Sequence, residues 1–168
     1  MPEIIKCFRE TLPTVRLIGK RYGNSDRDEY GGFGGKWGDW FKNGWFELLE
    51  NHGASPDNGN SYLGVMRSVN DDFEYWVGMF FDENKEVPEG FSYVDIPAGD
   101  IATCYIYGYD NGELFGDEVH NKCLENVFQR GFVVQNTPWF FERYNCPRYT
   151  TPDENGKVIL DYCVYIND

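Results

Sequence analysis

The sequence predicts a mostly antiparallel α+β domain in which a strand-helix-strand-strand unit occurs twice. Three observations favour this class: strands and helices do not strictly alternate, short turns join many neighbouring segments, and 168 residues suit one domain built of two fused halves. The halves would span about 12–82 and 90–168. We expect one long curved sheet with a helix from each half on one face, and a central groove between the helices as the ligand site.

The first unit begins with a strand at Thr14–Tyr22, which is rich in β-branched and aliphatic residues. The glycine-rich segment Asn24–Gly35 is expected to be a loop, and EYGGFGGKWG lacks the phosphate-binding GxxxxGK[ST] pattern, so we interpret it as a mobile lid or access loop. A helix is expected over Lys36–Asn51, because large apolar residues recur there every three to four positions. Gly44 weakens its middle.

A turn-rich stretch, His52–Asn60, separates this helix from two expected strands, Ser61–Val69 and Phe73–Phe81. Asn70 and Asp71 between the strands suit a hairpin turn, because both residue types tolerate positive φ. The first unit would therefore end in a β-hairpin.

The second unit repeats this order after a charged connector. A helix from about Glu113 to Arg130 carries an apolar stripe, and Gly131 follows where a glycine cap belongs. The expected strands are Phe91–Pro97, Ile101–Tyr107, Pro138–Tyr144 and Lys157–Ile166.

Charge and composition limit the possible partners. A net charge of −13 opposes contact with phosphates, so we expect no direct nucleic acid binding, and it favours the approach of cations. No apolar run approaches the roughly 20 residues of a membrane span, and the start of the chain resembles no secretory signal, which together predict a cytoplasmic protein. The 13 Phe, 12 Tyr and 5 Trp exceed what so small a core must bury, so some rings should line a concave surface.

The cysteines and histidines indicate neither a metal site nor a cofactor. The five cysteines are odd in number, dispersed and without CxxC spacing. His120 is the only candidate for a haem ligand in the second helix, but a lone helical histidine is more often a surface residue. His120 could also touch Cys123, yet no third group would orient the pair, so the cysteines are expected to be structural.

An ordered set of motifs resembles the gyrase-inhibitor-like (GyrI-like) family. Val87–Gly108 (VPEGFSYVDIPAGDIATCYIYG) is similar to the family's P-x-G, strand, IPAG, strand and glycine. Tyr75–Gly78 matches the strand that precedes the connector. Pro138–Tyr144 followed by Asp153–Ile166 resembles the family's ending, in which a glutamate-bearing strand precedes D-x-x-G and a final strand. The likeness covers nearly the whole chain.

The resemblance implies a duplicated strand-helix-strand-strand fold that binds lipophilic, often cationic, aromatic compounds. The family includes effector-binding domains of multidrug-responsive transcription activators, and its central acid lies in the strand after the second helix, where Glu142 is the only acid. In the activators a Tyr often precedes this acid, whereas this chain has Phe141. No helix-turn-helix segment precedes the domain, so we expect a standalone form.

Strand alternation places Phe140 and Tyr144 on the same face as Glu142. The residues alone leave two settings open for this carboxylate, a pocket or a solvated edge, and the resemblance favours the pocket. Burial there would raise its pKa, and a bound organic cation would keep it ionised, with cation–π contacts of roughly 0.5–2 kcal/mol from each flanking ring.

Five more aromatic residues are candidates for the pocket. Trp37, Phe41 and Trp45 form the apolar stripe of the first helix, which either packs into the core or makes one wall of the groove. Tyr75 and Tyr107 lie on strands beneath the helices, and we expect both to line the pocket, although a register error of one residue would reverse their faces.

The sequence favours a small-molecule-binding module, acting as a sensor or sequestering protein for lipophilic cations, with a separate regulator as a possible protein partner. One alternative, implied by the wider family, is a hydrolase of strained-ring cytotoxic compounds, with Glu142 as general acid or base and Tyr75 orienting water or donating a proton. Another is a gyrase-inhibitor-type interaction module whose acidic surface mimics DNA. The residues do not decide between binding and turnover.

Overall fold

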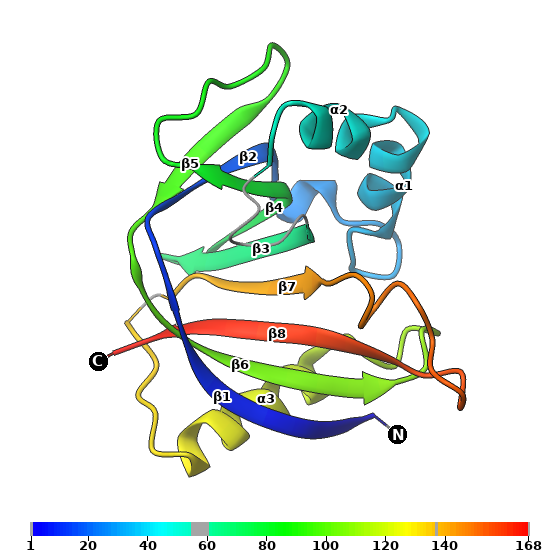
Figure 1. Cartoon of the computed structure of the whole chain (residues 1–168), viewed down its shortest axis with the longest axis vertical. Helices are drawn as coiled ribbons and strands as arrows, with labels where there is room; N and C mark the ends of the chain where they lie inside the picture. The colour runs from blue at the N-terminus through cyan, green and yellow to red at the C-terminus, as the bar shows by residue number, and fades with distance from the viewer. Residues whose placement is uncertain (1, 55–60, 137, 168) are drawn as a thin grey trace.

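The computed structural model describes residues 2–54, 61–136 and 138–167. Within these residues there are eight strands, one 3-10 turn and three α-helices (Figure 1). The strands are β1 (Glu3–Leu12), β2 (Val15–Tyr22), β3 (Tyr62–Val69), β4 (Asp72–Asp82), β5 (Ser92–Ile96), β6 (Gly99–Gly108), β7 (Phe140–Tyr144) and β8 (Val158–Ile166). The helical elements are η1 (Asn24–Asp26), α1 (Gly34–Lys42), α2 (Trp45–Asn51) and α3 (Asp117–Gln129).

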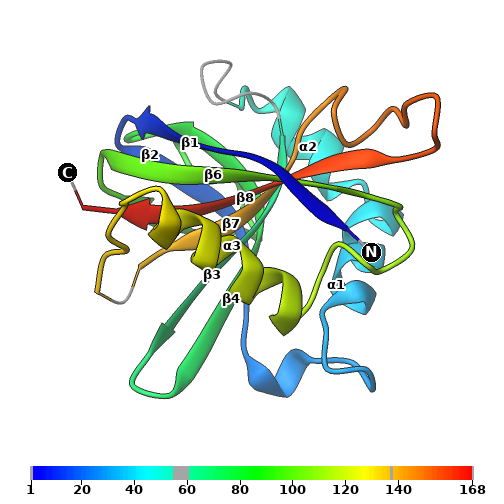
Figure 2. The ribbon, with the colours of Figure 1, turned by 90° about the horizontal axis from the view of Figure 1, so that it is seen from below.

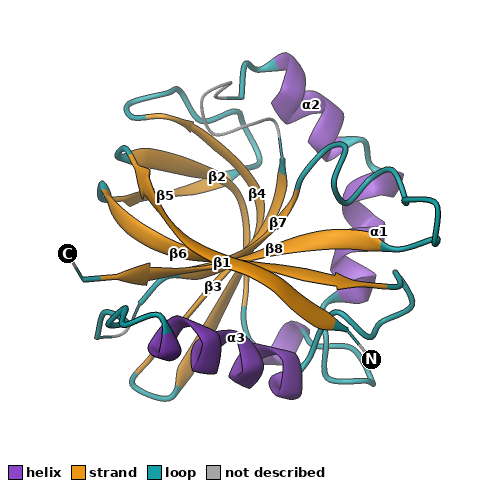
Figure 3. Cartoon of the chain, turned by 60° about the horizontal axis from the view of Figure 1, so that its bottom comes forward, coloured by secondary structure: helices purple, strands orange, loops and turns teal. Residues whose placement is uncertain are grey.

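The strands form one antiparallel sheet in the order β1-β6-β8-β7-β3-β4-β2-β5. The sheet is strongly curved and does not close on itself, as Figure 2 and Figure 3 show. This confirms the predicted α+β class. The pair β7–β3 lies at the middle of the strand order and joins strands of the two predicted halves, but β5 of the predicted second half also pairs with β2 of the first. The repeat boundaries themselves, at 12–82 and 90–168, stay a prediction.

The three α-helices pack on the same face of the sheet. The strand neighbours of Phe140 on β7 reveal this. Its paired neighbours are Met66 on β3 and Val164 on β8, whose side chains point to the same side. Met66 belongs to the core cluster that contains Trp40 of α1 and Leu49 of α2, and Val164 to the cluster that contains Val119 and Cys123 of α3. The space between the helices therefore lies above β7.

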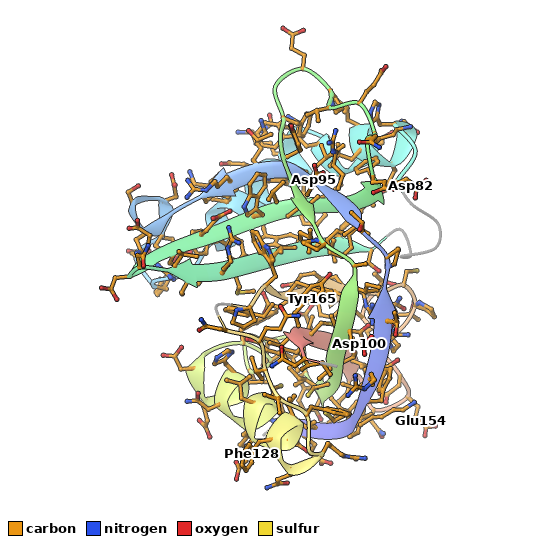
Figure 4. All side chains as sticks on the ribbon, turned by 90° about the vertical axis from the view of Figure 1, so that its left-hand side faces the viewer. Asp82, Asp95, Asp100, Phe128, Glu154 and Tyr165 are labelled. Atoms are coloured by element: carbon orange, nitrogen blue, oxygen red, sulfur yellow. The ribbon has the colours of Figure 1, made fainter. Side chains whose placement is uncertain are left out.

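The other face of the sheet has a core of its own, because its curvature brings distant strands together. Tyr165 of β8 is 3% exposed and packs in one cluster with Leu17 of β2 and Phe80 of β4. Figure 4 shows Tyr165 among the side chains between the upper and lower strands. The two faces of β7 are thus fixed independently, one by this core and one by the helices.

The prediction of one continuous first helix is wrong. Lys36–Asn51 is divided into α1 and α2 at Gly44, which has φ +69. This left-handed conformation is easy for glycine and cannot continue a right-handed helix. The second helix begins at Asp117 rather than Glu113, because Gly116 precedes it with φ +110.

The strand β1 was not expected from the sequence. It lies at the edge of the sheet and pairs with β6 alone. Edge strands commonly carry charged residues, so the mixed pattern of EIIKCFRETL lacks the alternation by which inner strands are found.

Two predicted turns agree with the structure, whereas the predicted loop Asn24–Gly35 contains η1 and the first two residues of α1. Asn70 and Asp71 have positive φ in the turn between β3 and β4, and Gly131 has positive φ after α3. Of the predicted turn His52–Asn60, residues 55–60 lie outside the described residues. Among the described helices, none has the length and hydropathy to cross a membrane.

Candidate functional site

A cavity of about 860 Å³ lies between α1 and α3 on the helix-covered face of the sheet. One wall comes from the glycine-rich segment 27–34 and from Trp37 of α1, and another from residues 112–116 and the start of α3. Strands β3, β4, β7 and β8 form its floor. The cavity therefore occupies the place predicted for the central groove.

Glu142 lies in the floor of this cavity and is 9% exposed. Its strand places it between Gly64 of β3 and Tyr162 of β8. Burial raises the pKa of Glu142 to about 7, although a hydrogen bond from the Tyr144 hydroxyl acts in the opposite direction. Within the part of the chain that the structure describes, no Lys, Arg or His forms an ion pair with this carboxylate.

Tyrosine hydroxyls surround the Glu142 carboxylate. Tyr75 accepts a hydrogen bond from Trp37 Nε1 at 2.9 Å. Burial and the nearby Glu142 raise the pKa values of Tyr75, Tyr144 and Tyr162. These hydroxyls therefore stay protonated at neutral pH, and they can donate to the carboxylate or to a ligand oxygen.

Aromatic rings form the walls around this polar centre. Phe33 stacks on Tyr75 with ring centres 4.1 Å apart and an interplanar angle of 5°. Trp37 meets Tyr144 edge to face at 4.8 Å. A flat apolar guest would find rings on two sides and a carboxylate beneath them.

Five of the eight predicted site residues line the cavity: Glu142, Trp37, Tyr75, Phe140 and Tyr144. The other three, Phe41, Trp45 and Tyr107, lie outside it. The side chain of Phe41 is 61% exposed on the outer surface of α1. Trp45 follows the break at Gly44, so it turns away from the cavity and packs against Trp40 and Phe91.

Tyr107 points to the opposite face of the sheet from Tyr75. Its neighbour Ile106 is completely buried in the core beneath α3, so alternation directs Tyr107 outward. There its hydroxyl donates a hydrogen bond to Asp153, and Lys157 lies over its ring. Tyr107 therefore does not line the pocket: it lies on β6 with its side chain on the outer face of the sheet, bonded to the turn that contains Asp153.

Several cavity residues were not found from the sequence. Phe33 comes from the segment interpreted as a mobile lid or access loop, in which no residue was assigned to the pocket, and Phe73 from the start of β4. His120 also lines the cavity, where its Nδ1 is hydrogen-bonded to the Tyr162 hydroxyl and burial lowers its pKa. Cys123 is 1% exposed in the core with Cys104, as expected for a structural cysteine. The described residues contain no group of three or more His, Cys, Asp or Glu placed to hold a metal ion.

No protein-family model and no curated protein sequence matches the chain. Solved structures do share its fold. SAV2435 bound to tetraphenylphosphonium is 14% identical with a TM-score of 0.73, and the match covers 97% of this chain and 94% of that chain. A proposed bacterial transcription regulation protein from Staphylococcus aureus MU50 is 12% identical with a TM-score of 0.70, covering 97% and 99%.

EcmrR, solved in a complex with DNA, shares the fold over part of its length. It is 14% identical with a TM-score of 0.61, and the match covers 97% of this chain and 57% of that chain. At such identities the likeness concerns the fold alone. That fold agrees with the one implied by the resemblance to the GyrI-like family.

Proposed function

We propose that the protein binds lipophilic, aromatic cations in the cavity between α1 and α3, as a sensor or sequestering protein. The observation that carries this proposal is the buried Glu142 carboxylate, which has no cationic partner among the described residues and lies beneath aromatic walls. A bound organic cation would supply the missing charge. The rings would add cation–π attraction of roughly 0.5–2 kcal/mol each.

The comparisons and the charge of the chain support this proposal. SAV2435, which has the same fold, is a protein solved with the lipophilic cation tetraphenylphosphonium. A net charge of −13 would steer such a cation towards the protein. The chain would then resemble SAV2435 in ligand class as well as in fold.

Isothermal titration of tetraphenylphosphonium into the protein at pH 8 tests the proposal. We expect binding by the wild type, and a loss of affinity of at least about tenfold in Glu142→Gln, because the amide keeps the shape and removes the charge. Glu154→Gln is the matched control, since Glu154 is exposed in the turn before β8 and points away from the molecule in Figure 4. Equal affinities in the two variants would contradict the role of Glu142.

A second candidate function is hydrolysis of strained-ring compounds, and the raised pKa of the Glu142 carboxyl group favours it. A carboxyl group with a pKa near 7 beside tyrosine hydroxyls can take up and release a proton at neutral pH. Glu142 would be the general acid or base, and Tyr75 would orient water. Turnover by the wild type and none by Glu142→Gln would support this function, whereas saturable binding without product would favour the binding module. The gyrase-type interaction stays a prediction.

A further inference from the structure

Arg27 is a cationic side chain in the wall of the cavity. Its guanidinium carbon lies 4.9 Å from the centre of the Phe33 ring and 4.6 Å from the centre of the Phe73 ring. All three residues line the cavity. A guanidinium at this distance is attracted by the electron-rich faces of the rings. The two rings therefore already hold a cation, which the chain itself supplies.

The contacts that hold Arg27 in place are local and exposed. Its Nε donates to Asn24 Oδ1 at 2.9 Å, and one terminal nitrogen donates to the Gly31 carbonyl oxygen at 2.6 Å. Within the described residues Arg27 has no carboxylate at ion-pair distance. The side chain is exposed, so water can replace both hydrogen bonds if the guanidinium moves.

The rings beneath Arg27 continue directly to the carboxylate. Phe33 stacks on Tyr75, and the Tyr75 hydroxyl lies beside Glu142 above Gly64. The cavity thus has an inner end with a carboxylate and an outer end with two rings covered by a guanidinium. A compact cation fits the inner end alone, whereas a cation with an extended ring system reaches both ends.

We propose that Phe33 and Phe73 form an outer cation subsite, which Arg27 fills when no ligand is bound and which an extended aromatic cation occupies by displacing Arg27. This inference rests on the proposed binding of aromatic cations at Glu142. Arg27 would then determine specificity, because it competes with extended cations and leaves compact ones unaffected.

The test compares two probe cations, the compact benzyltrimethylammonium and the extended dye rhodamine 6G, on the wild type and two variants. Arg27→Gln removes the internal cation. Lys20→Gln is the matched control, because the Lys20 ammonium also lies over two rings, 4.3 Å from Trp45 and 4.8 Å from Phe91, but outside the cavity. Relative to this control, we expect Arg27→Gln to bind rhodamine 6G about tenfold more tightly and benzyltrimethylammonium equally well.

The outcomes separate this inference from the proposed function. If the wild type binds neither cation, the proposed function fails and the subsite fails with it. If the wild type binds both, but Arg27→Gln and Lys20→Gln have the same affinities, only the subsite is overturned. Weaker binding of rhodamine 6G by Arg27→Gln would overturn it too.

A measurement on the wild-type protein covers the case in which a variant does not fold. The Nε–Hε signal of Arg27 in a ¹⁵N–¹H spectrum should be displaced by the ring currents of Phe33 and Phe73. Saturation with rhodamine 6G should return it to the position of a solvated arginine, and benzyltrimethylammonium should leave it in place. An Arg27 signal that rhodamine 6G does not move would overturn the inference.

Discussion

Gly64 of β3 lies directly across from Glu142 of β7, and its missing side chain makes room for the Tyr75 hydroxyl above the carboxylate. A Cβ atom at position 64 would come within 2.6 Å of the Tyr75 hydroxyl oxygen and 3.3 Å of Glu142 Oε1. The polar centre of the cavity thus depends on one glycine in an otherwise ordinary strand.

Gly64→Ala should therefore damage both stability and binding. Tyr75 cannot move away freely, because it is stacked on Phe33 and bonded to Trp37, so we expect the free energy of unfolding to fall by about 1–3 kcal/mol. Gly38→Ala in α1 is the control: its Cβ would meet nothing within 4 Å, and helix propensity predicts a gain of roughly 0.5–1 kcal/mol. Urea unfolding of both variants measures the difference, and equal stabilities would refute the crowding at Gly64.

Glu142 should make stability depend on pH in a defined direction. Its pKa is about 7 in the folded state and near the ordinary 4.5 in the unfolded state, so the neutral carboxyl favours folding below pH 4.5. That contribution is lost as pH rises towards 7 and amounts to roughly 3 kcal/mol. The difference in unfolding free energy between Glu142→Gln and the wild type should thus increase from pH 4.5 to 7 and then level off. A difference that is constant with pH would rule out the raised pKa.

Tyr75→Phe should leave the Trp37 indole N–H without its acceptor. The bond is part-buried beside the cavity, so its loss predicts a fall of about 0.5–1.5 kcal/mol in the free energy of unfolding. Tyr93→Phe is the matched control, because the Tyr93 side chain is 50% exposed on the edge strand β5. If the midpoint of thermal unfolding shifts equally in both variants, the Trp37–Tyr75 hydrogen bond does not contribute to stability.

The sequence predicts the inner strands, the antiparallel class and the position of Glu142, because alternation and motif order determine them. It does not predict the break at Gly44, since the same glycine could also have been tolerated inside one helix. The sequence analysis therefore places Trp45 in the wall of the groove, whereas α2 directs it away from the cavity and against Trp40. Tyr107 was misplaced because strand parity is known only once the register with β8 is known.

The residues that the sequence missed reach the site through tertiary contacts. Phe33 belongs to a glycine-rich segment without periodicity, yet it stacks on Tyr75. His120 meets Tyr162 only because α3 packs over β8, a relationship between residues far apart in the chain. No local pattern marks either residue as part of the cavity.

Asp161 should be the most sensitive carboxylate for stability. It is fully buried on the face of the sheet opposite the cavity and accepts hydrogen bonds from Arg143 Nε at 2.7 Å and Arg148 Nε at 2.9 Å. Asp161→Ala would remove one of the two carboxylates that pair with the buried Arg143, which keeps Glu10 at 2.8 Å, and this predicts a loss of about 1–3 kcal/mol. Asp95→Ala, which breaks the more exposed pair with Arg16, should cost much less. Similar unfolding midpoints for the two variants would contradict this ranking.

The affinity for tetraphenylphosphonium between pH 5 and 8, measured on the wild type and on Glu142→Gln, tests the central claim most directly. A cation that binds the ionised carboxylate must expel a proton below pH 7, so wild-type affinity should fall about tenfold for each pH unit below 7 and be nearly constant above it. Glu142→Gln should bind weakly and almost independently of pH. A wild-type affinity that does not change over this range, or a variant that follows the same curve, would contradict the account.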